Sequence, residues 1–201
     1  MELDININKL KLAIKKAGYF LFENDSKNYN VNIIGIRESN PVVNEFNDLM
    51  LVAWKFEGEW TLKQYKITTL AGLHWLKNPM NVKGCAILKE GRYRDAYKIA
   101  LHRGNYQALC QRKPVIVYRD NDRDNEYDFD VPTQEGLFGI NIHRASKYNI
   151  LEEVDKNSAG CQVFQDPQKF EEFMDIAEKS SKIWGNSFTY TLLNEAIFKD
   201  V

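Results

Sequence analysis

Residues 48–67, DLMLVAWKFEGEWTLKQYKI, decide the fold class of this chain. Two runs rich in aliphatic and aromatic residues lie on either side of Glu57-Gly58-Glu59, and each run favours an extended strand. A glycine between two polar residues at this point is typical of a tight turn. The segment therefore predicts a β-hairpin. Its expected strand residues are Leu49, Leu51, Ala53, Trp54 and Phe56, then Trp60, Leu62, Tyr65 and Ile67.

Further strands are predicted on both sides of this hairpin. Residues 31–36 are rich in Ile and Val, and residues 114–118 and 187–193 are compact apolar runs. Residues 139–143, GINIH, alternate isoleucine with polar residues, as a strand with one buried face does. Together these segments predict a mainly β fold.

Three helices are expected to flank the strands. An apolar stripe at spacings of three and four predicts an amphipathic helix within residues 1–26, packed on the domain or binding a partner. Residues 92–101, RYRDAYKIAL, predict a short helix. Asp166 as N-cap and Pro167 in the first turn mark a last helix. Residues 27–201 are expected to form a single domain that includes this C-terminal helix and the strand after it.

Composition excludes several classes of protein. The 201 residues include three cysteines, too few for a disulfide framework. With 27 Lys and Arg against 28 Asp and Glu, the chain offers no charge excess to attract nucleic acid or anionic lipid. We expect no membrane span, because no run approaches the roughly 20 apolar residues that one needs. The acidic, lysine-containing N-terminus does not fit a secretory signal, which predicts synthesis in the cytoplasm.

Two segments carry the residues best suited to chemistry. His143 ends the predicted strand that begins at Gly139, and Cys161 follows Gly160 in Ser158-Ala-Gly-Cys. A cysteine becomes nucleophilic when a nearby imidazole takes its proton and backbone N–H groups face the developing oxyanion. A glycine before the cysteine permits such a turn. A buried, inert cysteine is the alternative.

These segments, Gly139-Ile-Asn-Ile-His143-Arg and Ser158-Ala-Gly-Cys161-Gln-Val-Phe, resemble the active-site signature of the L,D-transpeptidase (YkuD-type) catalytic domain. The resemblance implies a β-sandwich with small helices. It also implies a cysteine enzyme that attacks peptidoglycan stem peptides and forms a thioester, resolved by water or by an amine. No cofactor is required for this chemistry.

By position, the resemblance implies a role for each residue of the signature. Cys161 is the nucleophile and His143 its general base. Ser158 shapes the turn and orients the imidazole, and the backbone N–H groups of Gly160 and Cys161 receive the oxyanion. Val163 stands where the family usually has an arginine for a stem-peptide carboxylate. The residues expected to contact substrate instead are Arg144, Arg103, His102 and Asn141.

The missing export signal bears on where such an enzyme acts. A cytoplasmic product that reaches the periplasm or cell wall after release fits a phage-encoded lytic or virion-associated protein. The alternative is a catalytically inactive sandwich module that binds cell-wall fragments or a protein partner. The sequence leaves the oligomeric state open, along with the choice between hydrolysis and cross-linking.

A second candidate site is the acidic loop after residue 118. Its spacing resembles an EF-hand calcium loop, in which oxygen ligands at alternate positions surround one Ca²⁺. Val131 replaces the glutamate at the last ligand position, and a solvated loop without metal is the alternative. Asn125 is expected to take the left-handed turn of such a loop. The predicted ligands are Asp120, Asp122, Asp124 and Asp128.

Overall fold

The structure is a computed structural model that describes residues 4–23 and 26–199, so residues 1–3, 24 and 25 of the predicted N-terminal segment lie outside it. The prediction of a mainly β fold with flanking helices is confirmed. Short 3₁₀ turns cover Asp155–Asn157 and Glu195–Phe198. The helices are α1 (Ile7–Lys16), α2 (Leu73–Lys77) and α3 (Pro167–Trp184). The strands are β1 (Asn32–Arg37), β2 (Asp48–Phe56), β3 (Glu59–Thr68), β4 (Cys85–Leu88), β5 (Gly91–His102), β6 (Tyr106–Gln111), β7 (Val115–Asp120), β8 (Thr133–Gly136), β9 (Ile142–Arg144), β10 (Gln162–Phe164) and β11 (Phe188–Asn194).

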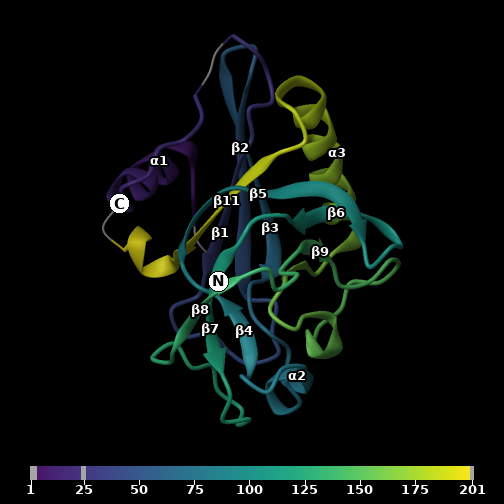
Figure 1. The fold of residues 1–201 in the computed structure, drawn as a ribbon. Coiled ribbons are helices and arrows are strands. Elements are labelled where there is room, and N and C mark those ends of the chain that lie inside the picture. The colour runs from purple at the N-terminus through teal and green to yellow at the C-terminus, as the bar shows by residue number, and fades with distance from the viewer. Residues whose placement is uncertain (1–3, 24–25, 200–201) are drawn as a thin grey trace.

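Eight strands form a closed barrel in the order β1-β11-β5-β6-β9-β10-β3-β2, and β4, β7 and β8 form a separate three-stranded sheet. The two end strands of the sequence, β1 and β11, pair in parallel and close the barrel. Strands β9 and β10 are the other parallel pair. In Figure 1 the small sheet and α2 lie below the barrel. This topology is not specifically the sandwich that the sequence resemblance implies.

The predicted hairpin is confirmed. Strands β2 and β3 pair without interruption from Asp48↔Ile67 to Phe56↔Glu59. The turn residues Glu57 and Gly58 both adopt positive φ, 52° and 84°. Two consecutive positive φ values match the right-handed twist of the flanking strands, which is why a glycine stands in this turn.

Helices α1 and α3 cover different parts of the barrel. On α1, the buried residues Leu10, Ala13 and Ile14 pack in one cluster with outward-facing residues of β1 and β2. On α3, the Asp166 carboxylate accepts the backbone N–H groups of the first turn, as predicted. Its buried face joins the same cluster as the barrel interior. Figure 1 shows the two helices on opposite sides of the barrel. No helix in the described ranges has the length and apolar character that crossing a membrane requires.

The short helix predicted over residues 92–101 is wrong. This segment lies within β5, a twelve-residue strand that pairs with β11 on one side and β6 on the other. A bulge interrupts its pairing with β11 between Phe188 and Tyr190, and Asp95 adopts a φ of 53°. The bulge shifts the inward face of the strand, so buried residues no longer alternate strictly.

Candidate active site

The predicted nucleophile and base are brought to neighbouring strands. Strands β9 and β10 run parallel with His143 opposite Val163, so Cys161 precedes β10 next to Asn141. Side chains alternate across a strand. Ile142, next to His143, belongs to the interior cluster, and Gln162, next to Cys161, accepts a hydrogen bond from the hydroxyl of Tyr190 in that cluster. His143 and Cys161 therefore share the outer face of the barrel. The sequence predicted that His143 points away from the core, yet other side chains cover it and leave it only 6% exposed.

The Cys161 thiol is held by backbone groups. Its Sγ accepts a weak hydrogen bond from Asn141 N at 3.4 Å and lies 3.5 Å from Gly139 O, to which it donates. Within the described ranges, no hydrogen bond joins this sulfur to either ring nitrogen of His143. Burial raises the pKa of the Cys161 thiol to about 11, against smaller lowering effects from the Asn141 N–H and Arg103. The thiol is therefore neutral at pH 7.

Hydrogen bonding fixes the tautomer of His143. Its Nδ1 lies 2.9 Å from Arg144 O, and since a carbonyl can only accept, Nδ1 carries the proton. The Nε2 atom therefore bears a lone pair. Burial, His102 and Arg103 lower the pKa of the imidazole to about 3. His143 is thus a neutral base with the correct tautomer to accept a proton at Nε2.

A second histidine supports the first. The rings of His102 and His143 stack with centroids 4.2 Å apart. Asn141 Oδ1 accepts the Gln111 backbone N–H at 2.8 Å, which turns its Nδ2 to donate to His102 Nδ1 at 3.0 Å. His102 is therefore also neutral, and burial lowers its pKa further. The structure places His102 and Asn141, both predicted to contact substrate, where they hold the His143 ring.

Ser158 and Gly160 shape the turn before Cys161. The Ser158 hydroxyl donates to Cys161 O at 3.0 Å and accepts from Gly160 N at 3.2 Å. Two details differ from the prediction. Arg144 O, rather than Ser158, orients the imidazole, and the Gly160 N–H is occupied by Ser158 instead of facing an oxyanion. The Cys161 N–H has no partner in the described part of the chain, so it remains available.

The two candidate arginines differ in freedom. The Arg144 guanidinium lies 4.2 Å from the Tyr106 ring centroid, near Phe170, and 3.8 Å from the Glu171 carboxylate of α3. The Arg144 guanidinium is therefore held against these aromatic rings and the carboxylate. Arg103 is exposed in the β5–β6 turn, and its charge lowers the pKa values of Cys161, His143 and His102. Arg103 is thus the cation that acts on the site.

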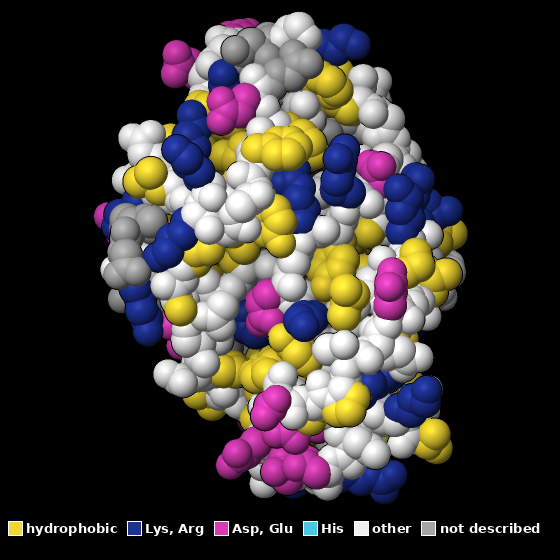
Figure 2. All heavy atoms as spheres, turned by 60° about the vertical axis from the view of Figure 1, so that its left-hand side comes forward, with side chains coloured by type: hydrophobic (Ala, Val, Ile, Leu, Met, Phe, Trp, Pro, Cys, Tyr) yellow, Lys and Arg dark blue, Asp and Glu magenta, His cyan; other side chains and the backbone are white. Residues whose placement is uncertain are grey.

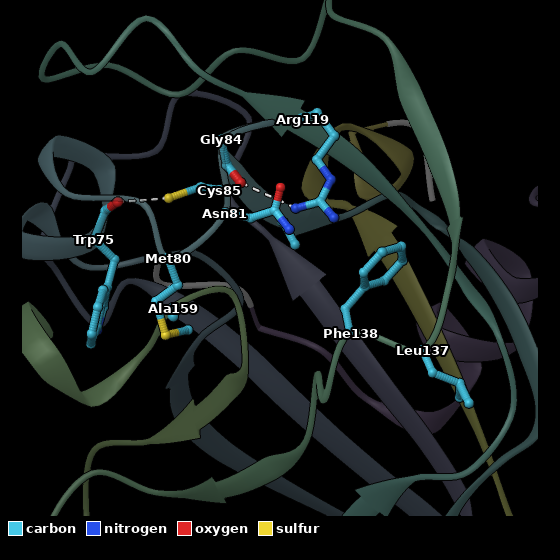
Figure 3. Close-up of a pocket in the computed structure, with 10 residues that line it drawn as sticks. Trp75, Met80, Asn81, Gly84, Cys85, Arg119, Leu137, Phe138 and Ala159 are labelled. Atoms are coloured by element: carbon cyan, nitrogen blue, oxygen red, sulfur yellow. Dashed lines mark hydrogen bonds between the residues drawn. The ribbon is translucent and has the colours of Figure 1, made fainter.

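A cavity of about 280 Å³ that the sequence did not indicate lies beside the turn that precedes Cys161, with Ala159 in its wall. Figure 3 shows Arg119, Phe138 and Leu137 on one side and Trp75 and Met80 on the other. These residues come from β7, a loop before β9, α2 and the loop after α2. No sequence pattern could have joined them, because the chain segments meet only in the folded structure.

Three of the four predicted metal ligands come together. Carboxylate oxygens of Asp120, Asp122 and Asp128 lie within 4.8 Å of one another. Asp124 instead accepts the Glu126 backbone N–H at 2.7 Å. The left-handed turn expected at Asn125 falls at Arg123, whose φ is 66°. Figure 2 shows acidic side chains gathered at the lower end of the molecule, the end where the loop after β7 lies in Figure 1.

Burial and the neighbouring carboxylates raise the pKa of Asp120 to about 6, although the Asp128 N–H opposes this. Its charge is thus poorly compensated by the protein itself. Carboxylate oxygens at this spacing fit Ca²⁺, which prefers hard oxygen ligands.

Comparison with known proteins identifies no relative: no family model, no curated protein and no solved structure matches this chain. The chemistry of the site is therefore inferred from the residues and their geometry.

The geometry predicts slow, steeply pH-dependent alkylation of Cys161. With a pKa of about 11, roughly one thiol in 10,000 is ionised at pH 7, and only the thiolate reacts. The iodoacetamide rate at Cys161, followed by peptide mass mapping, should rise about tenfold per pH unit from 7 to 10. Glutathione in the same tube, with a pKa near 8.5, should level off earlier.

The His143→Ala variant should show the same pH slope, since the imidazole it lacks is uncharged throughout this range. A rate that levels off below pH 8 in the wild type, and loses that plateau without His143, would instead indicate a resting thiolate–imidazolium pair.

Proposed function

We propose that the protein is a cysteine enzyme that acts on peptidoglycan stem peptides through a thioester on Cys161. The observation that carries the proposal is the parallel β9–β10 pair, which sets Cys161 and a His143 with a free Nε2 lone pair on one outer face. The Ser158-x-Gly160-Cys161 turn beside it supports the resemblance to L,D-transpeptidases. We further propose that the fold is a form of their β-sandwich whose sheets join at both edges into a barrel.

In the proposed mechanism, substrate binding turns the Cys161 thiol from its weak contacts with Gly139 and Asn141 toward His143. As sulfur attacks the peptide carbonyl, the thiol proton passes to His143 Nε2. The carbonyl oxygen becomes an oxyanion that accepts the Cys161 N–H. The carbon–nitrogen bond then breaks, the leaving amine takes the proton from the imidazolium, and a thioester remains.

Water or a second amine then attacks the thioester carbonyl and gives its proton to Nε2, and the thiol leaves with that proton restored. The resting pair stays neutral because the pKa values of the thiol and the imidazole, about 11 and about 3, oppose charge separation. Charge therefore develops only as the attack proceeds. His102 and Asn141 keep the ring in place during both transfers.

Intact mass spectrometry after rapid mixing with purified muropeptides tests the proposal. We expect an adduct equal to the muropeptide without its leaving residue, mapped to the peptide that contains Cys161. Free shortened stems would indicate hydrolysis, and dimers would indicate cross-linking. Neither adduct nor product with stems of several types would contradict the enzyme.

The second candidate is a catalytically inactive module, such as a phage structural or virion-associated protein, that binds wall fragments or a protein partner. The observation that favours it is the high pKa of Cys161 together with the low pKa of His143. Equilibrium binding of muropeptides to the wild type, with no mass change on Cys161, would support this module over the enzyme. In either case we propose that the protein acts in the periplasm or at the cell wall after its release.

We also propose that Asp120, Asp122 and Asp128 hold a structural Ca²⁺. Calcium at about 100 times its Kd should raise the melting temperature by about 5 °C at pH 7.5. Asp122→Ala should remove this shift, whereas Asp175→Ala, which removes an exposed carboxylate of α3, should keep it. At pH 5 the shift should shrink, because the raised pKa of Asp120 leaves its carboxyl mostly protonated there. An equal shift in the two variants would contradict the site.

A further inference from the structure

Arg119 is built into the wall of the cavity in Figure 3. Its Nε donates to the Gln134 side chain at 2.9 Å, and its Nη1 donates to Gly84 O at 3.1 Å. The guanidinium lies 4.8 Å from the centroid of the Phe138 ring. These contacts hold the side chain in one position, and its Nη2 makes no hydrogen bond among the described residues.

The charge of Arg119 has no counter-ion in the described ranges. Its hydrogen-bond partners are neutral, and none of the residues that line the cavity is acidic. A second cavity of about 460 Å³ that Arg119 also lines has no carboxylate in its wall, and Lys83 adds a second cation there. A half-buried guanidinium with free donors and no counter-ion attracts an anion, for which its planar donor fork is well shaped.

The cavity adjoins the proposed nucleophile. Ala159, in its wall, is two residues before Cys161, which limits their Cα separation to about 7 Å. Phe138, in the opposite wall, precedes Gly139, whose carbonyl contacts the Cys161 sulfur. The two segments that hold the thiol thus continue directly into the cavity walls. A ligand that reaches from Arg119 to Cys161 needs to be only a short peptide end.

We propose that this cavity binds the C-terminal carboxylate of the substrate peptide, with Arg119 as its ion-pair partner and a specificity-determining residue. The position of the scissile bond rests on the proposed function of Cys161, whereas carboxylate binding does not. Apolar groups of Met80, Leu137 and Phe138 line the same cavity and fit a small apolar side chain on the terminal residue. The enzyme would then favour removal of a terminal residue over cleavage within a longer chain.

The test measures binding apart from catalysis. Cys161→Ser protein labelled with ¹⁵N is titrated with acetyl-L-lysyl-D-alanine and with the same dipeptide as its C-terminal amide. The Trp75 indole N–H and the Gly84 amide report on the cavity. We expect saturable shifts at both probes with the acid, and affinity for the amide at least about tenfold weaker, since a charge-assisted contact is lost.

Two variants in the same Cys161→Ser background test the role of the cation. Arg119→Gln should weaken acid binding about tenfold and remove the preference over the amide. Leu137→Asp is the second variant because Leu137 is 65% exposed, so it adds a repelling charge without removing a structural contact. Leu137→Asp should also weaken binding of the acid. Ile150→Asp, at a side chain 61% exposed outside the cavity, is the matched control and should bind as the parent does.

Equal affinity for acid and amide, or shifts at Trp75 that persist unchanged in Leu137→Asp, would overturn the proposal. Failure of the enzyme proposal gives a different result. Acid binding at the cavity without any Cys161 adduct in the wild-type protein would support the carboxylate site and contradict the proposed catalysis. Turnover with no preference for a free carboxylate would support the enzyme and contradict the carboxylate site.

Discussion

Cys161→Ala protein is expected to convert muropeptides at least about a thousandfold more slowly than the wild type while keeping its fold. The reason is that the thioester forms on the Cys161 sulfur in the proposed mechanism, so the route is lost when that sulfur is removed. The fold should persist because, among the described residues, the sulfur makes only two long hydrogen bonds, with Gly139 O and Asn141 N. Product release is measured by chromatography and the fold by thermal denaturation.

Cys110→Ser is the matched control. Cys110 is another half-buried free thiol, and its sulfur contacts Ala100 O at 3.6 Å. Its substitution should leave turnover within about twofold of the wild type. His143→Gln should lower turnover by roughly 10²–10⁴, the usual contribution of a general base. Turnover that survives in Cys161→Ala would remove the nucleophile assignment.

Gly160→Ala is expected to destabilise the protein by about 3 kcal/mol or more. Gly160 has a φ of 118°, which L side chains rarely adopt, and an added Cβ would lie 2.0 Å from the Ala86 backbone oxygen. That oxygen belongs to β4, so relief requires the small sheet to move away from the turn that carries Cys161. Urea denaturation followed by tryptophan fluorescence measures the free energy of unfolding.

Gly18→Ala provides the comparison. Its φ of 77° is also positive, but nothing lies within 4 Å of its added Cβ. Only the backbone strain remains, so a cost of about 1–2 kcal/mol is expected. If the two variants unfold at the same urea concentration, the close approach of β4 to Gly160 contributes nothing.

Local patterns predicted most elements of this fold. The β2–β3 hairpin follows from one turn and two apolar runs, and α3 follows from the cap at Asp166 and the proline after it. Each of these signals lies within a few residues. Closure of the barrel depends on β1 meeting β11, and no local signal in either strand specifies that partner.

The error at residues 92–101 has a physical cause. Tyr93, Ala96 and Tyr97 are buried, at spacings of three and four that are typical of a helix. The bulge at Asp95 produces this spacing in a strand, because it rotates the chain between Tyr93 and Ala96. A periodicity rule alone cannot separate the two cases.

In the candidate site too, features within one short segment could be predicted from the sequence, whereas contacts between distant segments could not. The order of His143 and of the turn at Ser158, Gly160 and Cys161 was visible in the sequence, because each group lies in a short segment. The stacking of His102 on His143 was not, since the β5–β6 hairpin reaches this face only after the barrel forms. Arg119 was missed for the same reason: it comes from the small sheet, which meets the site in space alone.

The parallel pairing of β1 with β11 also determines when the molecule can be completed during synthesis. The ribosome delivers β1 well before β11, which emerges only after α3. Until then β1 has β2 alone, and an unpaired edge stays open to other chains. Pairing over such a separation is slow, so the nascent chain keeps an unpaired sheet edge for as long as the residues between β1 and β11 are being translated.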